Sequence, residues 1–304
     1  MPNVYASTIV DAPVEAVWKV VRDFNGLPTW LPGVAKSEIE DGRDADCVGC
    51  VRRITVDNGA TCSERLLALD DSRYIVSYAF VENLFPISGH RATKELIPVT
   101  AGDRTFVQWS AHFLDQPGHE GETAPVMQAQ VFEAGLASLV QKCAGAAGPE
   151  GAVRWDGWRP AKVFCSSVIN GPVEKVWDRV RDFIGMGAWH PDIRDMKMIG
   201  GVRSDKISGV RDFMFGDGRI MERLTYLNDA DHEFRYLIEQ SPMPWLNYHA
   251  GARFLPITAG NKTFAVWTAD WMASPNDDVK LIVDIHQNVF QKAFDTLNER
   301  FFPA

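Results

Sequence analysis

Glu222 is the clearest candidate for acid–base chemistry in the sequence. It alternates with Ile220 and Leu224 along a strand-like run, so its side chain is expected on the apolar face of that strand. A carboxyl group in such a place has a raised pKa unless it is paired, which suits a catalytic acid or a hydrogen-bond anchor. An ion pair with an arginine of a neighbouring strand, Arg211 or Arg253, explains the position equally well.

Glu64 stands in the same setting in the first half of the chain. Its neighbours two residues away are Cys62 and Leu66, which again puts the carboxyl group on an apolar face. Glu64 is therefore a candidate for ligand binding, with an ion pair to Arg52 as the structural alternative.

A second strand-like run carries His249 and Arg253 on one face. If that face points inward, the two side chains are able to bind a carboxylate or stabilise an enolate, and His249 shares a cavity with Glu222 for proton transfer. The corresponding positions of the first half hold Arg91 and Glu95, which are candidates for ligand binding. If the face points outward, these are ordinary surface residues.

His190 and Asp192 flank a proline in the second half, where the first half has Leu31 and Gly33. A histidine beside a carboxylate is a general acid or base near neutral pH, and a solvent-exposed helix end is the structural alternative. Because the second half has the richer polar set, we predict that it holds the principal pocket. Large aromatic side chains line a pocket or form core, and the candidates are Trp245, Trp267 and Trp271 in the second half and Trp109 in the first.

No motif in the sequence requires a metal or a cofactor. The chain has no nucleophile elbow, phosphate-binding loop or dinucleotide fingerprint. Cys47 and Cys50 form a lone C-x-x-C pair without a second pair or a histidine at ligand spacing, so no zinc site is expected. Cofactor-free chemistry or plain binding remains.

The second half of the chain repeats the first. Ala-Pro-Val-Glu-Ala-Val-Trp at 12–18 returns as Gly-Pro-Val-Glu-Lys-Val-Trp at 171–177, and Val-Arg-Asp-Phe at 21–24 returns at 180–183. Matches continue to the end of each half at a nearly constant offset, which indicates duplicated domains rather than a solenoid of short units.

We therefore predict two domains, residues 1–146 and 160–304. A linker rich in glycine, alanine and proline joins them, and its Trp155 and Trp158 are expected to pack onto one of the domains.

Each half opens with a short strand and an amphipathic helix and continues with five or six strand-like runs. A long amphipathic segment, 126–142 or 279–302, closes it. An antiparallel sheet must bury one face, and the closing helix is available to cover it. These elements predict an α+β domain with a curved sheet, a covering helix and an internal apolar pocket between them.

The opening Ala-Pro-Val-x-x-Val-Trp, the Val-Arg-Asp-Phe and the aromatic-x-Pro that follows resemble the START-related helix-grip superfamily, of the SRPBCC or polyketide cyclase/dehydrase type. Residues 49–110 are similar in layout to plant abscisic acid receptors, and the two-domain plan is similar to di-domain aromatase/cyclases. The resemblance implies two tandem helix-grip domains, each a curved antiparallel sheet wrapped around a long C-terminal helix. Leu31 and His190 replace the receptor lysine that meets the ligand carboxylate, so hormone sensing is not expected.

We accordingly expect a cofactor-independent enzyme of the cyclase, aromatase or lyase kind that acts on a small hydrophobic or polyketide-like substrate. The alternative is a protein that binds or transfers a lipid or secondary metabolite without chemistry. A net charge of −9 without a basic stripe argues against nucleic acid and anionic membranes as partners. No run approaches the ~18 apolar residues of a membrane helix and the first residues lack a signal-peptide pattern, so we expect a cytoplasmic protein.

Overall fold

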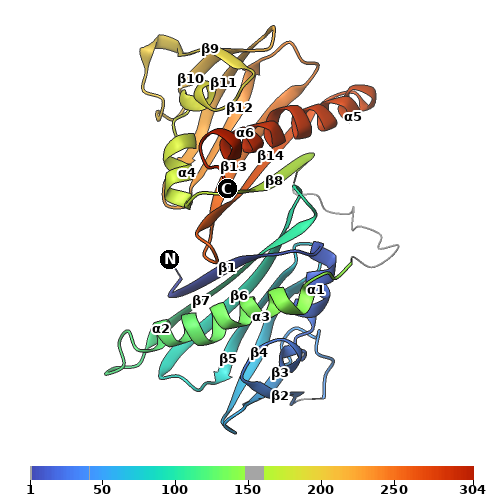
Figure 1. Cartoon of the computed structure of the whole chain (residues 1–304), viewed down its shortest axis with the longest axis vertical. Helices are drawn as coiled ribbons and strands as arrows, with labels where there is room; N and C mark the ends of the chain where they lie inside the picture. Colours follow the sequence, from blue (N-terminus) through green and yellow to red (C-terminus); the bar gives the residue numbers. More distant parts are fainter. Residues whose placement is uncertain (1, 41, 148–160) are drawn as a thin grey trace. The chain divides into compact units, whose positions relative to one another are not determined.

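The computed structural model describes residues 2–40, 42–147 and 161–304. The described residues form two compact units, which divide between residues 147 and 161 (Figure 1). The linker residues Trp155 and Trp158 lie outside the described residues. The two units are built in the same way.

The first unit has seven strands, a helix after the first strand and a closing helix after the last. Its elements are β1 (Val4–Val10), α1 (Val14–Arg22), the short 3-10 helix η1 (Leu27–Thr29), β2 (Val34–Ile39), β3 (Val51–Val56), β4 (Thr61–Asp70), β5 (Ile75–Glu82), β6 (Ile87–Val99), β7 (Arg104–Asp115), and a closing helix made of α2 (Thr123–Val126), η2 (Met127–Glu133) and α3 (Ala134–Cys143).

The second unit repeats this order. Its elements are β8 (Val163–Ile169), α4 (Val173–Val180), η3 (Gly185–Ala188), β9 (Ile193–Met198), η4 (Ile199–Gly201), β10 (Val210–Phe215), β11 (Gly218–Asn228), β12 (Glu233–Gln240), β13 (Leu246–Ile257), β14 (Lys262–Met272), and a closing helix made of α5 (Pro275–Asp284), η5 (Ile285–Gln291) and α6 (Lys292–Arg300).

Each unit contains one antiparallel seven-stranded sheet, ordered β1-β7-β6-β5-β4-β3-β2 or β8-β14-β13-β12-β11-β10-β9. Bulges shift the register between Ser63 and Glu64 and between Met221 and Glu222, and such bulges bend a strand. The closing helix crosses one face of the bent sheet in each unit (Figure 1). The predicted architecture, two tandem helix-grip domains of the α+β class, is confirmed.

The first helix of each unit is fixed by the same polar clamp. The indole N–H of Trp18 donates to Asp71 at 2.8 Å, and Arg22 on the next turn binds the same carboxylate. In the second unit, Trp177 donates to Asp229 at 2.9 Å. The clamp joins the amphipathic helix to the turn after β4 or β11, so the helix cannot slide along the sheet.

The predicted closing helix is present in each unit, but it is not α-helical throughout. The middle stretches η2 and η5 are π-helical. Phe132 in η2 stacks on Trp109 with ring centres 4.2 Å apart, and Phe290 in η5 stacks on Trp267 at 4.5 Å. A π-helical turn contains more residues than the 3.6 of an α-helical turn. The spacing of apolar residues in the sequence does not predict such a turn.

Each unit has a hydrophobic core between its sheet and its closing helix. On β7, Val107, Trp109, Ala111 and Phe113 are all buried, because alternate residues of a strand share one face. Within the described residues, no helix is long and apolar enough to cross a membrane.

Candidate functional site

Arg52 and Glu64 form a buried ion pair on the neighbouring strands β3 and β4. Their Cα atoms are direct partners in the register, and Arg52 donates from Nε to Glu64 Oε2 at 2.9 Å and from Nη2 to the same oxygen at 2.5 Å. Nη1 donates to the carbonyl oxygen of Phe24, and the guanidinium lies over that residue's ring. Glu64 therefore faces the core as predicted, and a buried arginine engages its carboxylate.

Arg211 and Glu222 repeat this pair in the second unit. Arg211 Nε donates to Glu222 Oε2 at 2.7 Å, and Nη2 donates to the same oxygen. Burial raises the pKa of Glu222, and the guanidinium of Arg211 opposes the shift. The partner of Glu222 is thus Arg211 and not Arg253, and the presence of the same pair in both units favours a structural role.

His249 and Arg253 lie on the outer face of β13. Both are exposed, whereas Ala250 and Ala252 on the same strand are buried. The prediction that His249 and Glu222 face one cavity is wrong, because Glu222 is buried on the core side of its sheet. The small alanines, not the polar residues, occupy the core face of this strand.

Arg91 and Glu95 of β6 are likewise outside the core. Arg91 is exposed, and half-buried Glu95 accepts a hydrogen bond from Gln108 at 2.6 Å. The expectation that they line an internal pocket is therefore wrong. The core face of β6 instead carries His90 and Lys94, which the sequence analysis missed.

Lys94 is a buried amine enclosed by aromatic rings. The residue is 3% exposed, and its Nζ lies 4.1 Å from the ring centre of Trp109, 4.7 Å from that of Tyr78 and 5.4 Å from that of Trp30. No hydrogen bond or ion pair reaches Nζ from the described part of the chain. Burial lowers the pKa of Lys94 to about 7, so roughly half of the amine is unprotonated at neutral pH.

Four buried polar atoms of the first unit lack a hydrogen-bond partner among the described residues: Nδ1 of His90, Nε1 of Trp30, Oδ1 of Asp115 and Oγ1 of Thr123. The His90 ring lies 4.1 Å from that of Phe80, and burial lowers its pKa to about 4, so the ring is neutral at pH 7. In the second unit, Tyr248 and Ala252 occupy the positions of His90 and Lys94. On the core face of this strand, the first unit therefore has a histidine and an amine where the second unit has a tyrosine and an alanine.

His190 and Asp192 do not form the expected pair. His190 is 1% exposed, its Nε2 lies 3.2 Å from the carbonyl oxygen of Val289, and burial lowers its pKa to about 4. Asp192 forms an ion pair with Lys292 at 2.7 Å. His190 is thus a neutral group that joins the η3 segment to the closing helix, and neither alternative considered for it, a solvent-exposed helix end or a histidine paired with a carboxylate, is found.

The four candidate tryptophans are part of the packed interior. Trp109 and Trp267 are each 1% exposed and stack under the closing helix. Trp271 stacks on Tyr248 with ring centres 5.6 Å apart, and half-buried Trp245 lies 4.8 Å from the same ring. Their contact with a ligand stays a prediction.

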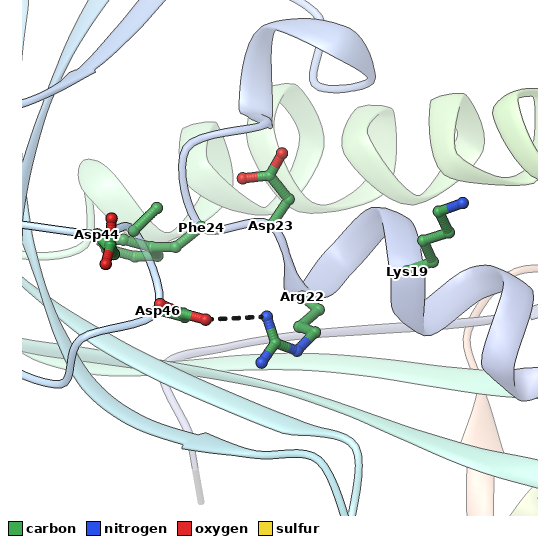
Figure 2. Close-up of a pocket in the computed structure, with 7 residues that line it drawn as sticks. Lys19, Arg22, Asp23, Phe24, Asp44 and Asp46 are labelled. Atoms are coloured by element: carbon green, nitrogen blue, oxygen red, sulfur yellow. Dashed lines mark ion pairs between the residues drawn. The ribbon is translucent and has the colours of Figure 1, made fainter.

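One cavity of about 520 Å³ opens at the end of α1 in the first unit (Figure 2). Its lining residues are Lys19, Arg22, Asp23, Phe24, Asp44, Ala45 and Asp46. Asp44, Asp46 and Cys47 each place a potential ligand atom within 4.8 Å of the others, but all three are exposed and Arg22 already pairs with Asp46 at 3.5 Å. Exposed acidic groups are common without a bound ion, so we assign no metal site here.

A second cavity, of about 380 Å³, lies on the outer face of the second sheet. His249 and Arg253 line it together with Arg235 and Asp270. The predicted catalytic residues of β13 thus border a surface cavity and not the apolar interior.

The family model described as polyketide cyclase/dehydrase and lipid transport matches residues 1–144 and again residues 160–301. Among solved structures, the chain is similar to the protein XoxI from Bacillus cereus, at 27% identity over 45% of this chain and 92% of that one, with a TM-score of 0.41. It is also similar over 99% of both chains to the di-domain ARO/CYC BexL from the BE-7585A biosynthetic pathway, at 11% identity and a TM-score of 0.40. The chain therefore belongs to the polyketide cyclase/dehydrase and lipid transport family and carries two copies of its domain in tandem.

Proposed function

We propose that the protein is a cofactor-independent enzyme of the cyclase type that binds a small hydrophobic substrate inside its first unit and promotes enolisation of that substrate at Lys94. One observation carries this proposal: an amine without a charged partner lies inside the first unit, where the second unit has Ala252. The fold does not need an amine at this position, since the second copy forms without one.

The chemistry follows from the protonation state of Lys94. An amine whose pKa is about 7 is a base of suitable strength at neutral pH and accepts a proton from the carbon beside a carbonyl group. The surrounding rings of Trp30, Tyr78 and Trp109 keep water away from Nζ and give its surroundings an apolar character that suits a hydrophobic substrate. An enolate formed in this way attacks a second carbonyl group of the same molecule, which is the ring-closing step of a cyclase.

This proposal moves the principal site from the second unit to the first. In the second unit, Glu222 is occupied by Arg211, His190 lies against the closing helix, and His249 and Arg253 lie outside. The remaining buried residues of its sheet are mainly aromatic and aliphatic, so a supporting role suits it better.

The test is hydrogen–deuterium exchange at the α-carbon of 2-tetralone, a small hydrophobic ketone, followed by NMR in buffered D2O. The full chain should accelerate exchange, and Lys94→Met should reduce the rate by about 10²-fold or more, the usual scale for loss of a general base. Lys162→Met is the matched control: Lys162 also lies near a tryptophan ring, 5.6 Å from that of Trp271, but it is paired with Asp278 in the second unit.

Equal rates for Lys94→Met and the unsubstituted chain would contradict the proposal. Quenching of tryptophan fluorescence by 2-tetralone without any accelerated exchange would instead support the alternative, a protein that binds or transfers hydrophobic molecules without chemistry. The apolar enclosure of Lys94 and the family's description both fit that second function.

A further inference from the structure

We infer that Lys94 forms a covalent imine with its ligand, which makes the ligand a hydrophobic aldehyde or ketone. The inference rests on the proposed function, because it requires a ligand inside the first unit. It goes further in naming the bond that holds the ligand and therefore the chemical class that is recognised.

Burial of Lys94 favours a nucleophilic amine over a permanent cation and outweighs the attraction of the ring faces for the charged form. Glu64 is the carboxylate whose field reaches Lys94, but both hydrogen bonds from Arg52 converge on its Oε2. The Nζ atom therefore meets ring faces and no carboxylate among the described residues. A lysine desolvated in this way loses its proton readily and becomes a nucleophile toward carbonyl carbon.

The comparison between the two units shows that this arrangement is not a packing requirement. The strand residue that pairs with Trp267 in the second unit is Ala252, the counterpart of Lys94. A buried ammonium without a counter-ion destabilises a fold, so an apolar residue at position 94 would be the more stable choice. A costly ionisable group in one copy and an alanine in the other indicate a chemical use.

The reaction needs no oxidant, reductant or cofactor. The lone pair of unprotonated Nζ attacks the carbonyl carbon, the C=O π electrons move to oxygen, and one amine proton follows to give a carbinolamine. Loss of the hydroxyl group with the second amine proton, as water, leaves a C=N bond between Lys94 and the ligand. Protonation of that nitrogen by solvent acidifies the neighbouring C–H, whose proton passes to the released water, so an enamine takes the place of the enolate that Nζ would form by direct proton removal.

Two uncommitted polar groups complete the chemistry of the site. The Trp30 ring is in contact with Lys94, and its buried N–H has no partner in the described structure, so it is a donor available to a carbonyl oxygen. His90 lies on the same face of β6 as Lys94, and its Nδ1 also has no partner there. Neutral groups of this kind are suitable hydrogen-bond partners for the hydroxyl group of a carbinolamine, but they do not neutralise the charge of an ionised carboxylate.

The experiment traps the imine. The full chain is incubated at pH 7 with 2-naphthaldehyde and sodium cyanoborohydride, and the labelled lysine is located by peptide mass spectrometry. We expect Lys94 to be labelled at least about 10²-fold faster than exposed lysines, because an amine of pKa about 7 is unprotonated on the order of 10³ times more often at pH 7 than one of pKa about 10.4. Three controls are needed: the labelling of Lys162 in the same chain, the Lys94→Met variant, and a reaction without sodium cyanoborohydride.

The alcohol 2-naphthylmethanol and the acid 2-naphthoate separate this inference from the proposed function, since neither forms an imine. If either binds with quenching of tryptophan fluorescence that Phe132→Ala alters and Phe290→Ala does not, while the aldehyde labels Lys94 no faster than Lys162, the imine is refuted and a non-covalent site in the first unit stands. If none of the three probes binds and Lys94 is unlabelled, the inference and the proposed site both fail. Selective labelling of Lys94 that excess alcohol slows supports both.

Discussion

A buried ion pair between an arginine and a glutamate occupies equivalent positions in both units, so we expect it to have the same role in each. Arg52 and Arg211 each donate twice to one glutamate oxygen and once to the backbone carbonyl of a phenylalanine that follows the first helix. The pair therefore ties the sheet to the segment after α1 or α4. Removing one charge of the pair should lower the stability of the fold strongly, because the other charge is then left buried without a partner.

We predict that Glu64→Gln and Glu222→Gln each lower the free energy of unfolding by about 3–5 kcal/mol, measured by urea denaturation. The loss should be similar at both positions because the geometry is the same. The double variant Arg211→Met/Glu222→Leu should lose less than Glu222→Gln alone, since it leaves no buried charge. A fully stable Glu222→Gln protein with impaired turnover would instead return Glu222 to a catalytic role.

Lys94 should make the stability of the protein depend on pH in a defined window. Its pKa is about 7 in the folded chain and 10.5 when unperturbed, so between these values the unfolded state binds more protons. The contribution of Lys94 to the free energy of unfolding therefore rises as the pH increases above about 7. It is lowest below pH 7, where folding must bury the charged amine. Burial is the main cause, Arg52 adds to it, and Glu64 opposes it.

The measurement is the difference in unfolding free energy between the unsubstituted chain and Lys94→Met at pH 6, 7.5 and 9. Lys94→Met should be the more stable protein at pH 6, and its advantage should shrink as the pH rises. Groups that titrate in both proteins cancel in this difference. A constant difference across the range would mean that Lys94 keeps its proton in the folded state.

The alternation of residues predicted some of these positions and not others. Glu64 was placed correctly because Cys62 and Leu66 are both apolar and fix the phase of β4. The sequence does not show which face of β13 points inward, because the residues that share a face with His249 are a glycine and Arg253 and neither indicates burial. Glu222 pairs with Arg211 because the two residues are direct partners in the strand register. A local sequence pattern does not predict that register.

At the scale of elements, the closing helix determines how much room the core has. The glycine at position 135 faces Leu31 and Trp109 so closely that a Cβ atom there would lie 2.6 Å from the former and 2.9 Å from the latter. The π-helical turn just before it sets Phe132 flat against Trp109. π-turns inside α-helices occur often at functional sites, and this one lies over the ring that contacts Lys94.

The order and type of elements were predictable because strongly periodic runs are separated by turn residues and because the second half repeats the first. The short strand predicted at the start of each half is found at Val4–Val10 and Val163–Ile169. The π-turn was not predictable, because it results from packing against Trp109 and Trp267 and not from a local signal.

Phe132→Ala should open a path to Lys94. Removing this ring lowers the free energy of unfolding by about 3–5 kcal/mol and leaves a space beside Trp109. Trapping of 2-naphthaldehyde on Lys94 should become faster than in the unsubstituted chain. The matched variant Phe290→Ala removes the equivalent ring from the second unit, so it should cost similar stability without changing the labelling of Lys94; equal acceleration by both variants would contradict the assignment of Phe132 as the local barrier.

At the scale of the whole molecule, duplication has produced two units with the same backbone plan and different interiors. Each has a complete strand order, its own core and its own closing helix. Chains of about 150 residues bury about 68–70% of the surface that they expose when unfolded, which is sufficient for an independent fold. The sequence repeat predicted this plan, but the buried amine of the first copy could not be located from the sequence, because its position depends on which residues of β6 face the core.

We therefore predict that residues 1–146 and residues 160–304, produced separately, each fold cooperatively. Urea unfolding followed by tryptophan fluorescence and by far-UV circular dichroism should give one coincident transition for each fragment. The control fragment 1–122 lacks the closing helix and should not fold, because Trp109 and the rest of the core face lose their cover. Fragment 1–146 should also retain selective labelling of Lys94, since every group that surrounds the amine comes from the first unit. If that fragment folds but its Lys94 reacts no faster than exposed lysines, the second unit must contribute to the site, and the assignment of the chemistry to the first unit alone is wrong.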